Sequence, residues 1–242
     1  MRPLPLILAT VAVMFISTEA PAGLTTAACL AQKQKVWGGL RKCEAAEKAK
    51  LLQSKPADVA KCRTQLQARL AKLDEKATDA AIACRYGVNT GAEAGTVTDY
   101  DTGLQWEQKS DDGSIHDKDD TYTWSDGGGG YTQPDGTAFK VFLGTLNNGT
   151  SSDGSATSEC FAGHCDWRLP TIVELQTILV DACPTTPCID PIFGPTAHND
   201  YWSATTYAAN PVRVWFVYFT GGDMYYDGKA DSLYVRAVRS GL

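Results

Sequence analysis

The clearest candidates for metal chemistry are in an acidic stretch before the middle of the chain. Five aspartates lie between residues 111 and 120, and Asp117, Asp119 and Asp120 are close neighbours in it. Carboxylate oxygens are the ligands that calcium prefers, but the spacing does not match an EF-hand loop and the closing glutamate of that loop is missing. We interpret the stretch as a solvated acidic loop with Asp117, Asp119 and Asp120 as candidate calcium ligands. Calcium is the one cofactor that the sequence suggests.

A second group of polar and aromatic residues lies in the last fifth of the chain. Sugar recognition needs aromatic rings that stack on pyranose faces, beside carboxylates and amides that bind hydroxyls. Two adjacent residues of a regular strand point to opposite faces, so at most one of Tyr225 and Tyr226 can point into a core. The candidate ligand-binding residues are His198, Asn199, Asp200, Arg213, Tyr225, Tyr226, Asp227 and Lys229.

Catalytic chemistry is not expected from this sequence. Its three histidines, His116, His164 and His198, are scattered over separate loops. They offer neither a zinc-ligand pair at helical spacing nor a partner for a nucleophile elbow. We predict that they are surface histidines and assign no catalytic residue.

The first residues are typical of a secretory signal peptide. A basic Arg2 is followed by an apolar run over residues 4–16 and then by small residues, which predicts a signal peptide over residues 1–22. A lipoprotein anchor would use Cys29, but the apolar run stops too early for it. No other segment approaches the ~18 apolar residues that a membrane span needs. The protein is therefore expected to be secreted, periplasmic or at the cell surface.

Eight cysteines in an exported chain indicate disulfides rather than thiolate metal sites. They fall into an early and a late set of four, which indicates two modules with their own bridges. The predicted pairs are Cys43–Cys62, Cys160–Cys165 and Cys183–Cys188, with Cys29–Cys84 as a fourth.

The fourth pair conflicts with simple helix geometry. In two straight helices, Cys29 to Cys43 would span about 21 Å and Cys62 to Cys84 about 33 Å, and a disulfide bridges Cα atoms only ~4.4–6.8 Å apart. Either Cys29 lies on an extended lead-in, with Gly38-Gly39 as the break, or the bridge does not form.

Residues 23–90 are predicted to form an antiparallel helical hairpin. The segment is rich in Ala, Lys, Leu, Gln and Glu, and apolar residues recur every three or four positions from Val59 to Cys84, with a turn near Pro56. Between Cys29 and Tyr86 there are thirteen Lys/Arg and six Asp/Glu, whereas from Gly87 onward there are eight and twenty-one. The hairpin is thus basic and the remainder acidic, so the two parts should have different partners.

Residues 91–242 show the pattern of an α+β domain. Strands are predicted around an Asp-Thr-Gly turn at residues 101–103, and again over residues 201–207, 212–219, 224–226 and 233–239. Two helices lie between them: one over residues 138–146, and one of three turns that begins with a capping box at Thr171 and Glu174. Trp167, just before that cap, is expected in the core.

Several motifs in this order resemble a known family, the domain at the C-terminus of Lcl-type collagen-like bacterial adhesins. The motifs are Asp-Thr-Gly-Leu-Gln-Trp (101–106), Asp-Trp-Arg-Leu-Pro-Thr (166–171), Tyr-Trp-Ser (201–203), Val-Trp-Phe-Val-Tyr-Phe (214–219) and Val-Arg-Ala-Val-Arg (235–239). The resemblance covers about residues 95–242. It implies a C-type-lectin-like fold with two helices and an antiparallel sheet, in which the first and last strands pair and the variable loops gather at one end. Here the disulfide-stapled hairpin replaces the collagen-like repeats.

The resemblance favours a non-catalytic adhesin or lectin-like protein of the bacterial envelope that binds a glycan or protein on a cell surface. The strong negative charge of residues 87–242 disfavours sulfated polysaccharides, so we expect a neutral glycan or a calcium-bridged acidic one. The alternative is a structural or assembly protein whose basic hairpin docks to a partner or to an anionic envelope surface. An oxidase like the formylglycine-generating enzyme is the third reading, although that enzyme's paired cysteines lie among its last strands, where this chain has none. Nucleic acid is not an expected partner.

Overall fold

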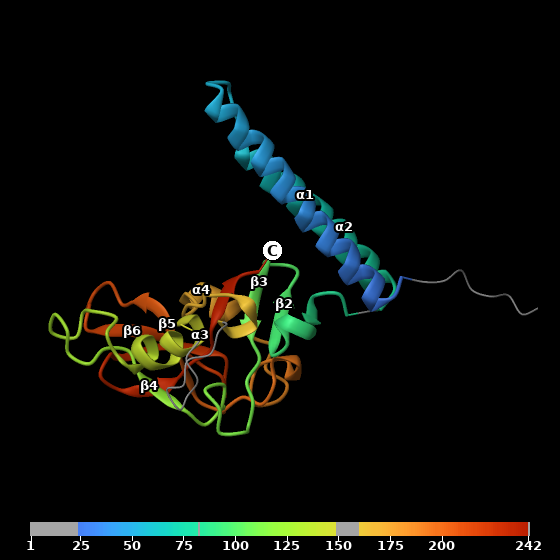
Figure 1. Cartoon of the computed structure of the whole chain (residues 1–242). Helices are drawn as coiled ribbons and strands as arrows, with labels where there is room; N and C mark the ends of the chain where they lie inside the picture. Colours follow the sequence, from blue (N-terminus) through green and yellow to red (C-terminus); the bar gives the residue numbers. More distant parts are fainter. Residues whose placement is uncertain (1–23, 82, 149–159, 242) are drawn as a thin grey trace, which may run out of the picture.

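A computed structural model describes residues 24–81, 83–148 and 160–241, and shows a helical hairpin joined to an α+β head (Figure 1). The predicted signal peptide lies outside the described residues. The hairpin consists of α1 (Thr26–Leu52) and α2 (Val59–Asp79). Among the described residues, no helix is both long and apolar enough to cross a membrane.

The hairpin forms where the sequence predicts it. Thr25 caps α1 by accepting a hydrogen bond from the Ala28 amide, and Asp58 caps α2 by accepting one from the Lys61 amide. The apolar stripe of α2 is buried against α1 through Cys62, Leu66, Leu70, Leu73 and Ala77. The predicted Cys43–Cys62 bridge, with a Cα separation of 5.7 Å, joins the helices near their bend.

The doubtful bridge between Cys29 and Cys84 is present, with a Cα separation of 5.9 Å. Neither predicted alternative is right, because α1 runs unbroken through Gly38-Gly39 and Cys29 is itself helical. The difference between the Cys29–Cys43 and Cys62–Cys84 spans is removed in α2, because this helix stops at Asp79 and Ala81 adopts a left-handed φ of 51°. The chain then leaves the helix axis, so Cys84 is not a further turn away from Cys62.

The described residues of the head form two sheets. The first has the order β1 (Tyr86–Val88), β2 (Thr96–Asp99), β3 (Leu104–Glu107), β9 (Val238–Ser240), with every neighbouring pair antiparallel. The second has the order β4 (Thr121–Thr123), β8 (Ser232–Tyr234), β5 (Asp200–Thr206), β6 (Arg213–Tyr218), β7 (Asp223–Gly228). All its pairs are antiparallel except β5 with β8, so the expectation of a wholly antiparallel sheet is corrected at that one pair.

The first and last strands of the head pair as predicted, but over a shorter length. Trp106 lies opposite Val238, and Leu104 lies opposite Ser240. The predicted single strand over residues 233–239 is in fact two, because Val235, Arg236 and Ala237 cross between the sheets and are buried. Arg236 fixes this crossing by donating to the carbonyl oxygens of Glu107 and Phe193.

The helices of the head are short. The predicted first helix is a π-helical turn (Ala138–Leu143) followed by α3 (Gly144–Asn148). The predicted capping box starts α4 (Ile172–Thr177), which has six residues instead of the expected three turns. The described part of the head also contains three 3-10 turns, η1 (Gly91–Glu93), η3 (Phe161–Gly163) and η4 (Pro191–Phe193). The α+β class and the preceding disulfide-linked hairpin are confirmed, and Trp167 is buried as expected.

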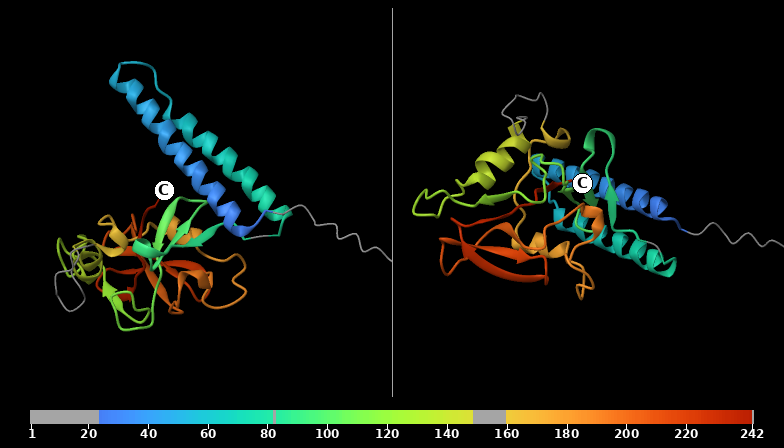
Figure 2. Two further views of the ribbon diagram at one scale, coloured as in Figure 1. Left: turned by 45° about the vertical axis from the view of Figure 1, so that its right-hand side comes forward. Right: turned by 90° about the horizontal axis from the view of Figure 1, so that it is seen from below.

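The hairpin packs against the head near the first sheet (Figure 2). Lys33 of α1 is fully buried and forms ion pairs with Asp74 of α2 and with Asp101 of the head. The indole N–H of Trp37 donates to the carbonyl oxygen of Tyr100 at 2.8 Å. Gly103, with φ +74°, leaves room for that indole, since a Cβ there would stand 2.5 Å from it. The hairpin is therefore docked on the head by specific contacts.

Candidate ligand-binding surface

Three aromatic side chains form a cluster on one face of the sheet edge made by β6 and β7. The rings of Tyr207 and Tyr226 are stacked, with centroids 4.2 Å apart and planes 5° from parallel. Trp215 stands perpendicular to both, with its centroid 5.4 Å from each. We call Tyr207, Trp215 and Tyr226 the aromatic platform.

The strand register explains why these three rings meet. Trp215 of β6 lies directly opposite Tyr226 of β7. Tyr207 follows β5, and a tight turn returns the chain to β6, where the Tyr207 amide donates to the carbonyl oxygen of Arg213. Arg213 precedes Trp215 by two positions and shares its face. Its guanidinium carbon lies 5.4 Å from the centre of the Tyr226 ring.

The platform is accessible because β7 is the edge strand of its sheet. Both predicted tyrosines are exposed, Tyr225 by 53% and Tyr226 by 39%, and they project from opposite faces. Tyr225 lies against Phe216, with ring centroids 6.0 Å apart, and takes no part in the platform. The chain thus offers two exposed tyrosines side by side in sequence, of which one belongs to an aromatic cluster.

Two carboxylates follow Tyr226 in the chain: Asp227 is still in β7 and projects from the face opposite the platform, and Asp231 is in the turn from β7 to β8. The Asp227 side chain accepts a hydrogen bond from the Gly228 amide, 2.7 Å long, and lies near Asp231. Partial loss of hydration and the neighbouring Asp227 carboxylate both raise the pKa of Asp231, while Arg213 opposes the shift. The platform therefore has one carboxyl group, that of Asp231, and one cation, that of Arg213, near its border.

The predicted residue Lys229 is not at this surface. Its side chain is buried, and its ammonium nitrogen lies 3.9 Å from the centre of the Trp124 ring and 3.0 Å from the Thr206 hydroxyl. Burial lowers its pKa. The turn after β7 directs this side chain inward, which the sequence pattern did not indicate.

The remaining predicted residues, His198, Asn199 and Asp200, lie at the other end of the sheet. Asp200 opens β5 opposite Tyr218, about 16 Å along β6 from Arg213 at ~3.3 Å per strand residue. Burial and, to a smaller extent, the negative charge of Asp227 raise the pKa of the Asp200 carboxyl. His198 borders a cavity of about 530 Å³ whose other walls include Pro187, Ile189, Pro191, Pro195 and Lys118. The eight predicted residues therefore do not form one site: Arg213, Tyr225, Tyr226 and Asp227 share the β6–β7 edge, and the others do not.

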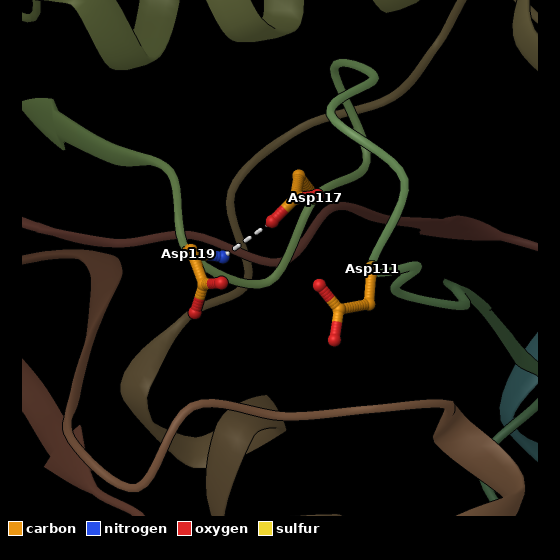
Figure 3. Close-up of side chains that lie close together, drawn as sticks. All are labelled: Asp111, Asp117 and Asp119. Carbon is orange, nitrogen blue, oxygen red and sulfur yellow. Dashed lines mark hydrogen bonds between the residues drawn. The ribbon is translucent and has the colours of Figure 1, made fainter.

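The acidic loop lies between β3 and β4, and its carboxylates gather within it (Figure 3). Asp111, Asp117 and Asp119 bring an oxygen each within 4.8 Å of one another, whereas Asp120 is placed beside the Tyr122 hydroxyl instead. Both oxygens of Asp117 already accept backbone amides, and the bond from the Asp119 amide is 2.8 Å long. These bonds lower the pKa of Asp117.

A cation of the protein itself sits beside these carboxylates. The Lys118 ammonium lies 2.7 Å from Asp119 and 3.2 Å from Asp111, and these partners raise its pKa to about 12. A calcium ion would have to displace this ammonium and compete with the amides that hold Asp117. The three carboxylates are therefore already held by backbone amides and by Lys118, all within the loop itself.

His116 is not a surface histidine as predicted. Its Nδ1 lies 2.8 Å from the carboxylate of Glu107, which is fully buried and also binds Lys109 and the Ala237 amide. Burial would raise the pKa of Glu107, but these cationic and amide partners outweigh it and lower the pKa. The group joins the acidic loop to β3 and β9.

The three predicted bridges Cys43–Cys62, Cys160–Cys165 and Cys183–Cys188 are all present, and the four disulfides indicate an extracytoplasmic protein.

Sequence reasoning missed two of the three platform residues, Tyr207 and Trp215. The signal for Trp215 was its two-residue spacing from Arg213, which places both on one strand face. Tyr207 had a weaker signal, its position before the Asn-Pro turn at residues 210–211. The exposure of both depends on β7 being an edge, which the sequence does not specify.

Comparison with known proteins covers the part of the chain that carries the platform. None of the curated proteins compared with the chain matches it. The model of the Lcl C-terminal domain matches residues 95–239, which is more than half of the chain and runs from the start of β2 into β9. The platform and the acidic loop both lie within this match, and the hairpin lies outside it. The chain therefore belongs to the Lcl C-terminal domain family.

Proposed function

We propose that this protein is an exported, non-catalytic binding protein, an adhesin or lectin-like module, whose head recognises a glycan through the aromatic platform. The observation that supports this is the stacked pair of half-buried Tyr207 and exposed Tyr226, which stands beside the half-buried Trp215 at the β7 edge of the sheet. Aromatic rings of this kind bury apolar sugar faces, and their hydroxyl groups remain free to bind polar ones.

The platform is ordered before a ligand arrives. Each of its rings contacts the other two, and the strands that carry Trp215 and Tyr226 are paired over six positions. Side chains that are already fixed lose little conformational entropy when they bind. A weak surface contact with a sugar can therefore contribute measurable affinity here.

Charge points to a neutral glycan. Residues 87–242 carry eight Lys/Arg against twenty-one Asp/Glu, which repels sulfated chains. The carboxylate of Asp231, in the turn after β7, can accept hydrogen bonds from sugar hydroxyls, and Arg213 can donate to ring or hydroxyl oxygens.

A glycan array probed with the mature protein tests the proposal. We expect binding to neutral glycans by the wild-type protein and a loss of about tenfold or more in affinity for Tyr226→Ala, because burial of one aromatic side chain is worth about 1.5–3 kcal/mol. Tyr225→Ala is the matched control, since it removes a neighbouring exposed tyrosine from the opposite face.

Three results would contradict the proposal. The first is equal loss in Tyr225→Ala and Tyr226→Ala with both variants folded. The second is binding that is abolished by a calcium chelator but insensitive to Tyr226→Ala, which would move the site to the acidic loop. The third is a wild-type protein that binds a cell-surface protein and no glycan.

A further inference from the structure

The bend of the hairpin is the part of the described molecule farthest from the head (Figure 1). It carries two exposed leucines. Leu52 is 90% exposed and Leu51 57% exposed, at the last turn of α1. At ~1.5 Å per helical residue, Leu52 lies about 22 Å beyond Trp37, where α1 contacts the head. We call residues 41–63 the hairpin tip.

The hairpin tip is strongly basic. It contains seven Lys/Arg and three Asp/Glu, and all seven basic residues are exposed. Its acidic groups have structural partners within the tip: Glu47 accepts from the Asp58 amide and the Lys50 ammonium, Asp58 caps α2, and Glu44 pairs with Arg63. The outward surface of the tip is therefore positive and has two unburied leucines at its end.

From this pairing of features, we propose that the hairpin tip docks on an anionic lipid surface, with Leu51 and Leu52 inserted at the level of the headgroups. Exposed apolar side chains flanked by lysines suit the boundary between headgroups and acyl chains, because the lysine stems reach along apolar surface while their ammonium groups bind phosphate. The anionic surface supplies the charge complementarity that the tip lacks in the free protein.

Other features of the molecule fit a shallow contact made end-on. The apolar stripe of α2 stays packed against α1, so only the end of the hairpin has apolar side chains to bury. The head is acidic, and the same lipid surface would repel it. The rigid hairpin would then hold the head, with its aromatic platform, away from the membrane. A contact between the tips of two copies is disfavoured because both tips are basic.

Sedimentation of the mature protein with lipid vesicles tests this inference. The protein should sediment with vesicles that contain phosphatidylglycerol, should not sediment with pure phosphatidylcholine vesicles, and should be released by salt. Leu51→Ser/Leu52→Ser should weaken the partitioning by about tenfold or more. Val173→Ser is the matched control, since Val173 is a 65% exposed apolar residue on the head, and it should leave partitioning unchanged.

A second pair of variants separates charge from apolar contact. Lys48→Glu/Lys55→Glu changes two exposed tip lysines and should abolish binding, since each lysine near an anionic surface contributes to attraction. Lys35→Glu/Lys72→Glu makes the same charge change on exposed positions nearer the head and should weaken binding less. All these positions are solvent-exposed, so circular dichroism should show an unchanged fold.

Several outcomes would overturn the inference. They are a wild-type protein that ignores phosphatidylglycerol vesicles, leucine variants that bind as well as wild type, equal effects of the two lysine pairs, or tip-dependent self-association in solution without vesicle binding. None of these outcomes bears on the aromatic platform, so the two proposals fail separately.

Discussion

Replacing Lys33 by methionine should loosen the hairpin from the head. The Lys33 ammonium is fully buried and contacts two carboxylates, Asp74 of α2 and Asp101 of the head. Methionine fills much of the same volume but removes the ammonium that Asp74 and Asp101 share, and Asp101 keeps only a longer ion pair of 3.7 Å with Arg85. Burial raises the pKa of Asp101, and Lys33 opposes that rise, so the variant should also make Asp101 easier to protonate.

The size of the effect follows from the exposure of the partners. Breaking a fully buried pair costs about 3–5 kcal/mol, whereas exposed pairs contribute about 1 kcal/mol or less. Asp74 and Asp101 are 47% and 37% exposed, so they regain water when the cation is lost. We therefore expect Lys33→Met to destabilise the docked hairpin by about 2 kcal/mol.

Hydrogen exchange of the Trp37 indole proton measures this directly. That proton is donated to the Tyr100 carbonyl across the hairpin–head contact. A loss of about 2 kcal/mol predicts exchange about thirtyfold faster. Lys35→Met, an exposed substitution on the same helix, is the control and should leave the rate unchanged. An unchanged exchange rate in folded Lys33→Met protein would refute the assignment of this ion pair as the docking contact.

Three further changes should alter stability in defined ways. Gly103→Ala should lower the free energy of unfolding, measured in urea, by more than about 2 kcal/mol because the new Cβ meets the Trp37 indole ring. Gly91→Ala, also at positive φ but in open space, should lower it only by the backbone strain. The pKa of Glu174 lies below its ordinary 4.5 because its arginine and capping partners outweigh its burial, so its contribution to the free energy of unfolding is present above pH ~4.5 and lost as pH falls through the folded pKa. In Glu174→Gln, the melting temperature should therefore fall less between neutral pH and the acid range than it does in the wild type. A melting-temperature curve parallel to that of the wild type would count against this. Removing the Cys29–Cys84 bridge by serine substitution should cost about 4 kcal/mol for a sequence separation of 55, and a cost below about 1 kcal/mol would show that α1 and the return after α2 are held by other contacts.

Local signals in the sequence were sufficient for much of the fold. Leu66 and Leu70 follow the helical period that buries them, and Thr171 with Glu174 forms the predicted capping box. The short-range disulfides follow from spacing alone, because five-residue separations bring the sulfurs together. These features depend only on residues near one another in the chain.

Features set by distant contacts were not predictable. Residues after Asp79 are good helix formers, yet the helix ends there because the chain must return to the Cys29 bridge and to β1. The run from Leu233 to Arg239 alternates like one strand, but it is divided between the two sheets and buries Arg236 where it crosses. In both places tertiary contacts override the local pattern.

The candidate binding surface shows the same difference between features set by local sequence and features set by distant contacts. The sequence identified Tyr225 and Tyr226 because adjacent strand residues cannot both be buried. It could not place Lys229 under the Trp124 ring, nor could it bring Trp215 and Tyr207 to the surface. Those facts depend on the order of strands in the sheet.

Indole resonances provide the most direct test of the platform as the glycan site. Of the six tryptophans, Trp215 alone is partly exposed, and the other five are buried. In a two-dimensional NMR titration with the neutral glycan that binds best on the array, the platform predicts that the Trp215 indole resonance shifts progressively and that the other five stay fixed. A glycan that binds while the Trp215 indole remains unmoved, with shifts in the acidic loop or near His198 instead, would contradict the account.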